Sequence, residues 1–320
     1  MPTPTRSASM KPLLVRLLQD GPVITDGAWG TELQARGLAI GDFPDAWNLS
    51  HPDRVAEVAR AYVEAGSQII LTNTFGANRI RMADHGAPEQ VAEINRRGVQ
   101  LSIQAAENRA SVFASIGPTG KLLMVGEVTL DEVRAAFIEQ AEALARGGAQ
   151  GLVIETMSDL DEAKAALDAA KRTGLPVVVC MVFDAGKEKD RTMTGATPEQ
   201  VASELTGAGA DVIGANCGLG IEGYVPVCRR LRAATDLPIW IKANAGLPTL
   251  VGGNVVYQTT PDQFASHVPA LIEAGASFIG GCCGTNPTFI RAVREVRGRL
   301  TSAEALIVHP TRGEPEHPAT

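Results

Sequence analysis

One repeated unit dominates this sequence. An amphipathic segment rich in Ala, Glu and Arg is followed by a glycine and then by a short run of β-branched and other apolar residues, at 64–71, 145–154, 207–213 and 273–279. The first part has the spacing of a helix, the glycine is typical of a helix C-terminus, and the apolar run suits a buried strand. Because the chain passes repeatedly from helix to strand, we expect a parallel sheet.

Eight runs qualify as strands. They are Val23 to Thr25, Gln68 to Thr72, Val112 to Ile116, Gly151 to Glu155, Pro176 to Val182, Asp211 to Ala215, Pro238 to Ala243 and Ser277 to Gly281. Helical patterns lie between them at Pro52 to Ala65, Leu130 to Arg146, Leu160 to Lys171, Pro198 to Thr206, Gly223 to Ala234 and Pro261 to Glu273. Eight such units favour one (β/α)8 TIM barrel over two open sheets. No linker of low complexity divides them, so we expect a single domain over residues 11–300.

Both ends of the chain are expected to be tails. Residues 1–10 carry one arginine and no apolar segment, so they do not form a secretory signal. The end from about residue 301 contains the stretch Thr311 to Pro318, which is too polar and proline-rich to bury. We predict a disordered N-terminal tail at 1–10 and a C-terminal tail at 301–320.

The overall charge restricts the partners. The formal net charge is -7 and the pI is near 5.4, so the chain lacks the basic face that nucleic acid or an anionic membrane surface would require. No apolar run approaches the roughly 18 residues that cross a bilayer. The five cysteines are an odd number in a long chain, which fits reduced thiols. We therefore expect a cytoplasmic protein that binds neither nucleic acid nor membrane.

The unusual polar residues fall after the expected strands. In chain order they are Asp26-Gly27, Asn73-Thr74-Phe75, Gly117-Pro118-Thr119, Glu155-Thr156, Asp184, Asn216-Cys217, Asn244 and Cys282-Cys283. Active sites of (β/α)8 barrels lie at the carboxyl ends of the strands. A random scatter would not favour one end, so we expect the functional site there.

Three cysteines give the strongest chemical signal. Cys282 and Cys283 are adjacent and bracketed by glycines after the eighth strand, and Cys217 follows the sixth. Only one strand separates these ends, so three thiolates could share one ion. Soft sulfur ligands suit Zn²⁺, and three protein ligands leave a fourth position open for chemistry. Simple burial is the alternative for any one cysteine, and a vicinal disulfide between Cys282 and Cys283 is disfavoured by its strained ring.

The charge of such a site favours one class of reaction. Zn²⁺ with three thiolates carries one net negative charge, so it generates hydroxide poorly but can bind and deprotonate a fourth thiol. That thiolate stays nucleophilic near neutral pH, and its alkylation gives a thioether, which is a much weaker ligand. The pattern predicts S-alkylation rather than hydrolysis.

Other polar residues allow two interpretations each. Glu155 could receive the ammonium of an amino-acid substrate or form a salt bridge with a neighbouring helix. The Asp26-Gly27 turn could hold a carboxylate with its backbone N–H groups, although an Asx turn is the simpler interpretation. Asn244 could reach the metal through its amide oxygen when no substrate is bound, or it could be a structural cap.

The chain resembles the homocysteine S-methyltransferase family, and most closely the homocysteine-binding barrel of cobalamin-dependent methionine synthase. The likeness is carried by Asp26 to Leu33, Thr72 to Asn78, Ser115 to Gly120, Ile154 to Met157, Gly214 to Cys217, Asn244 to Pro248 and Gly280 to Thr285. These segments span residues 23 to about 297. The resemblance implies a zinc-dependent enzyme that methylates the thiol of homocysteine to give methionine.

The resemblance also implies roles for single residues. Cys217, Cys282 and Cys283 would hold Zn²⁺, and the homocysteine sulfur would take the fourth position. Asn244 is similar in place to the residue that fills that position in the empty methionine synthase domain.

The amino-acid part of the substrate would bind elsewhere in the site. The resemblance implies that Glu155 and the Asp26-Gly27 turn hold its ammonium and carboxylate, and Asn216 is a further substrate-binding candidate. No catalytic side chain is expected beyond the zinc-activated thiolate of the substrate.

The methyl donor is left open by the sequence. S-methylmethionine, or a methyl-corrinoid protein with a methyltetrahydrofolate system, could supply the methyl group. The alternative is a zinc methyltransferase subunit of a corrinoid-dependent system that acts on another thiol or methylated substrate. A zinc-sensing or redox-sensing barrel that binds a partner is a third interpretation, and a homo-oligomer is compatible with all of them.

Overall fold

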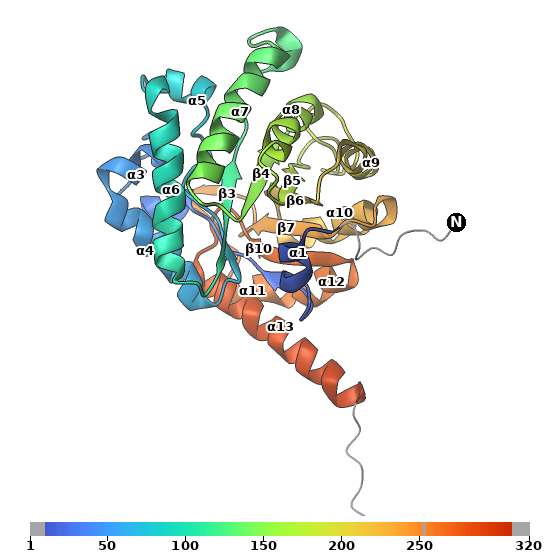
Figure 1. The fold of residues 1–320 in the computed structure, drawn as a ribbon. Helices are drawn as coiled ribbons and strands as arrows, with labels where there is room; N and C mark the ends of the chain where they lie inside the picture. Colours follow the sequence, from blue (N-terminus) through green and yellow to red (C-terminus); the bar gives the residue numbers. More distant parts are fainter. Residues whose placement is uncertain (1–9, 252–253, 309–320) are drawn as a thin grey trace, which may run out of the picture.

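The computed structural model describes residues 10–251 and 254–308, which form a barrel of parallel strands inside a ring of helices (Figure 1). The barrel strands are β1 (Val23–Ile24), β2 (Ile69–Ile70), β3 (Ser111–Ile116), β4 (Gly151–Met157), β5 (Val177–Met181), β6 (Val212–Gly220), β7 (Ile239–Asn244) and β10 (Ala276–Gly281). Their order is β1-β10-β7-β6-β5-β4-β3-β2. A parallel bridge between Thr25 and Ile69 joins β2 to β1, so the predicted (β/α)8 barrel is confirmed.

The barrel interior is apolar near the amino ends of the strands. Phe113 on β3, Val153 on β4 and Trp240 on β7 belong to one buried cluster, and the Trp240 ring stacks on the Phe113 ring at a centroid distance of 6.3 Å. Helix α1 (Pro12–Leu17) adds Leu14 to this cluster. The helix therefore closes the amino-terminal end of the barrel.

The next inward positions on the same strands are polar. Side chains alternate between the two faces of a strand, so the residues two places further along face the same interior, nearer to the carboxyl ends. These residues are Ser115 on β3, Glu155 on β4 and Lys242 on β7. All three are buried and line the cavity described below.

Helices cover the outside of the barrel (Figure 1). Those over the predicted helical segments are α4 (Pro52–Ala65), α7 (Leu130–Arg146), α8 (Leu160–Lys171), α9 (Pro198–Ala208), α10 (Ile221–Ala234), α11 (Pro261–Ser266) and α12 (Val268–Glu273). Thr129, Thr197 and Thr260 begin α7, α9 and α11 with capping boxes, in which the threonine and the residue three places on satisfy each other's backbone N–H groups. Local capping thus fixes where these helices start.

The helix predicted over residues 261–273 is two short helices. α11 ends at Ser266 and α12 begins at Val268, with His267 between them. Pro269 has no backbone N–H and cannot continue the hydrogen bonding of α11, which explains the break.

Several elements were not predicted. They are α1, α2 (Gly30–Gln34), α3 (Trp47–Ser50), α5 (Arg79–Asp84), α6 (Val91–Ala106), α13 (Pro287–Val308), the hairpin β8 (Thr249–Val251) and β9 (Asn254–Val256), and the 3₁₀ turns η2 (Pro44–Ala46), η3 (Pro88–Gln90) and η4 (Leu123–Val125). In α6 the buried face includes Asn95, Gly98 and Ser102, so its hydrophobic spacing is interrupted. Asn95 donates to the carbonyl of Ala77, which shows that this face packs through polar contacts as well.

The expected tails lie partly outside the described residues. Residues 1–9 and 309–320 are not described, and Met10 is the first residue that is. Helix α13 runs to Val308, past the predicted start of the C-terminal tail at 301, and its last turns extend beyond the barrel in Figure 1. Within the described parts of the chain, no helix combines the length and apolar character needed to cross a membrane.

Candidate metal centre and active site

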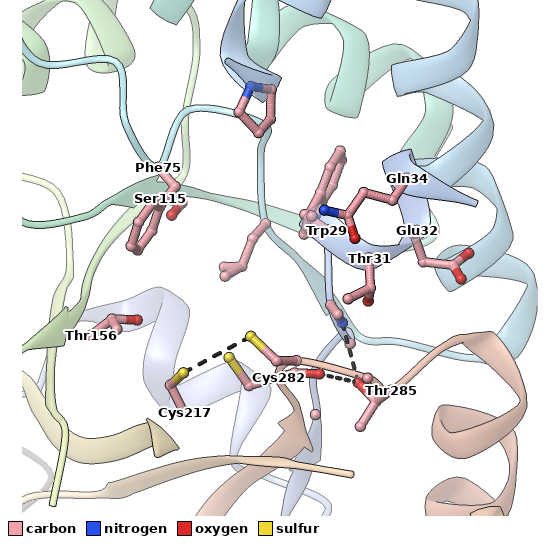
Figure 2. Close-up of a pocket in the computed structure, with 18 of the residues that line it drawn as sticks. Trp29, Thr31, Glu32, Gln34, Phe75, Ser115, Thr156, Cys217, Cys282 and Thr285 are labelled. Atoms are coloured by element: carbon pink, nitrogen blue, oxygen red, sulfur yellow. Dashed lines mark hydrogen bonds between the residues drawn. The ribbon is translucent and has the colours of Figure 1, made fainter. Parts of the chain in front are cut away.

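Three sulfur atoms meet at the carboxyl ends of β6 and β10. Cys217 lies within β6, while Cys282 and Cys283 follow β10 directly. The three Sγ atoms all lie within 4.8 Å of one another, and those of Cys217 and Cys283 are 3.9 Å apart. Figure 2 shows the sulfurs of Cys217 and Cys282 facing the same space. The expected convergence of the three cysteines is confirmed.

The backbone of β6 bends to bring Cys217 to this point. Its register against β7 shifts between Asn216 and Gly220, and Cys217 has a φ of 63°, in the left-handed region. Such a backbone costs a non-glycine residue about 1–3 kcal/mol and persists only where neighbours hold it. The Tyr224 hydroxyl donates to the Cys217 carbonyl at 2.5 Å and so holds the bend.

The sulfurs share protons when no ion is bound. The thiols of Cys282 and Cys283 donate to the sulfur of Cys217, which lowers the pKa of Cys217 to about 3. Its hydrogen bond to Cys217 raises the pKa of Cys283 to about 12. The separate hydrogen bond from Cys282 to Cys217 raises the pKa of Cys282 as well. The trio therefore stabilises one thiolate strongly, and a cation would have to displace the remaining two protons.

The donor set fits a soft divalent cation. Three cysteine sulfurs are typical zinc ligands and leave one position for an incoming group. Beside them Asn244, at the end of β7, is 4% exposed, and its buried Oδ1 has no hydrogen-bond partner. Asn244 also contacts Cys217 with its side chain. This orphaned oxygen suits the predicted role of Asn244 as a stand-in ligand, which stays a prediction.

Glu155 lies at the carboxyl end of β4, close to the cysteines. Its Oε1 accepts a hydrogen bond from Ser115 Oγ at 2.5 Å, and its Oε2 has a long contact of 3.4 Å to Nδ2 of Asn216. Burial raises the pKa of Glu155, while the Lys242 ammonium and the Ser115 hydroxyl act in the opposite direction. The side chain faces the cavity rather than an outer helix, so the salt-bridge interpretation of Glu155 does not apply.

Asn216 connects this carboxylate to the sulfurs. Its Oδ1 accepts from the backbone N–H of Thr156 at 2.7 Å, its Nδ2 donates to Thr156 Oγ1 at 2.7 Å, and Nδ2 lies 3.8 Å from Sγ of Cys282. Thr156 has a φ of 63°, as strained as that of Cys217. Asn216 therefore fixes two strained strand ends relative to each other, and its predicted contact with substrate stays a prediction.

Asp26 is held in a buried ion pair. Its Oδ1 accepts from Lys242 Nζ at 2.5 Å, and its Oδ2 accepts from Trp29 Nε1 and the Leu71 N–H at 2.8 and 2.7 Å. Burial alone would lower the pKa of Lys242, but the carboxylates of Asp26 and Glu155 outweigh it and raise that pKa. The Asp26 side chain is thus held by three donors.

Gly27, the second residue of this turn, lines the cavity. A Cβ at this position would lie 2.7 Å from the Tyr62 hydroxyl and 2.8 Å from Thr285 Oγ1. Only glycine fits against these two side chains, and the backbone of the turn lines the cavity. This arrangement leaves the backbone of the turn, and not the Asp26 carboxylate, as the part able to meet a substrate carboxylate.

A cavity of about 810 Å³ opens beside these groups. Figure 2 shows Trp29, Phe75 and Thr156 arranged around the space above the sulfurs. Tyr257 lines the same cavity; its ring packs on the backbone of Gly284, where a Cβ would lie 2.1 Å from Cγ of the ring. The Tyr257 hydroxyl also forms a hydrogen bond with Cys283.

Sequence reasoning missed Lys242, Ser115 and Tyr257 as site residues, and it named Thr156 only among the polar residues that follow the strands. Lys242 had a usable signal, because it is the one charged residue in the otherwise apolar run Pro238 to Ala243. Ser115 stands two places after Phe113 on β3, and only the barrel geometry shows that the two face the same interior.

Comparison with known proteins decides the family. The sequence pattern described as homocysteine S-methyltransferase matches residues 23–297, which covers most of the chain and every site residue above. The chain belongs to the homocysteine S-methyltransferase family. The resemblance inferred from the motifs is therefore confirmed.

Relatives of this homocysteine S-methyltransferase family member include long and short proteins. This chain is 31% identical over 310 residues to methionine synthase of Mycobacterium tuberculosis, and the match covers 92% of this chain and 26% of that protein. The match to methionine synthase of Mycobacterium leprae is 30% identical over 299 residues, covering 88% of this chain and 24% of that protein. The chain thus spans about a quarter of the length of these two relatives.

One solved structure matches this chain over nearly all of that structure's own length. The metallated form of the homocysteine methyltransferase MmuM from Escherichia coli is 26% identical and has a TM-score of 0.75. The match covers 88% of this chain and 99% of that one. That protein has a metallated form, which agrees with the three cysteines found here.

Proposed function

We propose that this protein transfers a methyl group to the thiol of homocysteine and so produces methionine. The observation that carries the proposal is the meeting of three cysteine sulfurs, all within 4.8 Å of one another, at a cavity that also contains an open carboxylate at Glu155. Membership of the homocysteine S-methyltransferase family supports it. The homocysteine methyltransferase of Escherichia coli, which this chain matches over nearly all of that protein, supports it further.

Cys217, Cys282 and Cys283 would hold Zn²⁺, which when bound lowers the pKa of a thiol in the fourth position and keeps its sulfur nucleophilic. The protein itself contributes position. Ser115 and Asn216 orient Glu155, whose Oε2 has only the long contact to Asn216 and can accept a hydrogen bond from the substrate ammonium. The backbone of the Gly27 turn can approach the substrate carboxylate.

With both ends of the amino acid fixed, the sulfur is directed toward the methyl donor in the cavity. The substrate sulfur attacks the methyl carbon while the bond from that carbon to the donor breaks, and the donor leaves with the electron pair. Fixing two reactants in line can lower the activation barrier by about 7–11 kcal/mol, because the entropy loss and solvent reorganisation that oppose the reaction have already occurred on binding. No protein side chain need form a bond to the methyl group.

The donor, the assembly and the location are proposals. We propose S-methylmethionine, or a methyl-corrinoid protein with a methyltetrahydrofolate system, as the donor. A homo-oligomer and a cytoplasmic location remain the predictions made from sequence.

Two measurements test the function. The protein, purified under reducing conditions, is analysed for zinc, and is then assayed for methionine formation from homocysteine with S-methylmethionine, S-adenosylmethionine, methylcobalamin or betaine. We expect about one zinc per chain and activity with at least one donor. A reduced protein that binds no zinc would rule the proposal out. Competition by other thiols separates homocysteine from the alternative of another thiol substrate.

A further inference from the structure

One buried cation lies among the acidic side chains of the cavity floor. Lys242 is in the middle of β7, its side chain is 2% exposed, and its Nζ lies 2.5 Å from Oδ1 of Asp26. Among the described residues it is the one lysine or arginine that is fully buried. A buried ion pair is seldom needed for packing, because apolar side chains of similar volume often stabilise a core at least as well. Its place beside the cavity calls for a functional reason.

Lys242 cancels the charge of Asp26. The other carboxylate oxygen of Asp26 accepts from the Leu71 N–H and the Trp29 indole, and the side chain is fully buried. The charge of Asp26 is therefore compensated, and its carboxylate, which is fully buried and is not among the residues lining the cavity, is not open to a substrate.

Glu155 is in the opposite situation. It lines the cavity, one of its oxygens accepts from Ser115, and the other has a single long contact of 3.4 Å to Asn216. The cavity floor beside the cysteines thus contains two carboxylates and one ammonium, which leaves one negative charge, and the open oxygen belongs to Glu155. The other two carboxylates that line the cavity are already engaged, because Glu32 pairs with Arg36 and Asp45 accepts from the Gly76 N–H.

We propose that Lys242 sets the charge selectivity of the cavity: by neutralising Asp26 it leaves Glu155 as the carboxylate beside the three cysteines that is open to a substrate, so the cavity selects thiols that carry one ammonium group. The inference rests on the proposed function, because it requires that a thiol bind beside the three cysteines. In this arrangement Lys242 is a positioning residue that acts through Asp26 and Glu155.

The selectivity can be measured by binding alone. Homocysteine is compared with 4-mercaptobutanoate, which has the same carbon chain, thiol and carboxylate but no amino group, by titration calorimetry on the zinc-loaded protein. The ratio of the two dissociation constants reports recognition of the ammonium. We expect the wild-type protein to favour homocysteine by about 10–100-fold, since the analogue forgoes one hydrogen bond between charged groups.

Three variants change this ratio in different directions. Asp26→Asn frees Lys242 to pair with Glu155, so the ratio should fall toward about one. Lys242→Met leaves Asp26 without its cation, so the ratio should widen about tenfold as the added negative charge disfavours the analogue. The double variant Asp26→Asn/Lys242→Met removes both charges and should return the ratio to within about threefold of wild type.

The outcomes separate the two proposals. If neither thiol binds the wild-type protein, the proposed function fails, and this inference fails with it. If both bind and Asp26→Asn keeps the wild-type ratio, or the double variant does not restore it, Lys242 does not control selectivity while the proposed function stands. Lys242→Met could fail to fold because the buried Asp26 carboxylate then has no cation to pair with. In that case the Asp26→Asn and double variants decide the question.

Discussion

The two ends of the barrel are built by the same strands, yet they have opposite chemistry. Near the amino end, Phe113, Val153 and Trp240 pack into an apolar layer that α1 closes. Two residues further along the same strands, Ser115, Glu155 and Lys242 face a cavity. One step of the two-residue strand period is therefore enough to pass from a layer that supports stability to a layer that supports chemistry.

The backbone shows the same contrast. Among the described strand residues that are not glycine, Thr156 and Cys217 have positive φ values, and both lie at the carboxyl end beside the cavity. Each costs about 1–3 kcal/mol. Packing in the apolar layer offsets this strain, so the two ends differ in what they contribute to folding.

The largest expected effect is at the sulfurs. Cys282→Ser replaces one soft ligand by a poor one, and because structural zinc sites of four ligands bind with about 10–16 kcal/mol, the loss should be on the order of 100–1000-fold in zinc affinity. Competition with a chromophoric chelator measures it. Cys228→Ser is the matched control, since Cys228 is buried in α10 against the carbonyl of Ala274 and should leave the affinity unchanged. Equal affinities in the two variants would contradict the metal centre.

The second effect should appear in substrate binding. Glu155→Gln removes the open carboxylate, so we expect KM for homocysteine to rise about 30–100-fold, because a hydrogen bond between charged groups is lost. Steady-state kinetics measure it. Glu162→Gln is the control: Glu162 is also buried, but it accepts from Thr119 on the outside of the cavity. A rise in KM in the control alone would reverse the assignment.

A third prediction tests the apolar end on the same strand. Val153→Ala deletes two methyl groups from the buried layer, two places before Glu155, and should lower the free energy of unfolding by about 2 kcal/mol. Denaturant titration measures it. Zinc affinity and KM should stay close to wild type, and a change in either larger than about threefold would show that the two layers are not independent.

The sequence was sufficient for the fold and for the meeting of the three cysteines, but for different reasons. Helix-to-strand repeats are local, so eight units could be counted without tertiary information. The cysteines were recognisable because thiols at the ends of two nearby strands are rare and chemically specific.

Other parts of the site needed three-dimensional information. The pairing of Lys242 with Asp26 was hidden because the two residues are 216 positions apart in the chain, and nothing local to either residue predicts the pair. The turn at Asp26 and Gly27 was expected to hold a carboxylate, and the structure adds that the Asp26 side chain forms a buried ion pair with Lys242. The bend at Cys217, which extends β6 to Gly220, likewise depends on contacts with Tyr224 and β7.

The smallest expected effect is at Tyr257, which joins the segment after the β8–β9 hairpin to the metal centre. Its ring packs on Gly284 and its hydroxyl contacts Cys283, so it can donate to a sulfur of a site that carries excess negative charge. Groups that hydrogen-bond to metal ligands typically contribute 10–100-fold to affinity. Because Tyr257 is only half-buried, Tyr257→Phe should weaken zinc binding by about tenfold, at the low end of that range. The control is Tyr62→Phe, whose hydroxyl donates to the Ala28 carbonyl and to no sulfur. If Tyr257→Phe and Tyr62→Phe bind zinc equally well, the polar layer of the barrel ends at the cysteines themselves, and the ring of Tyr257 serves only to cover them.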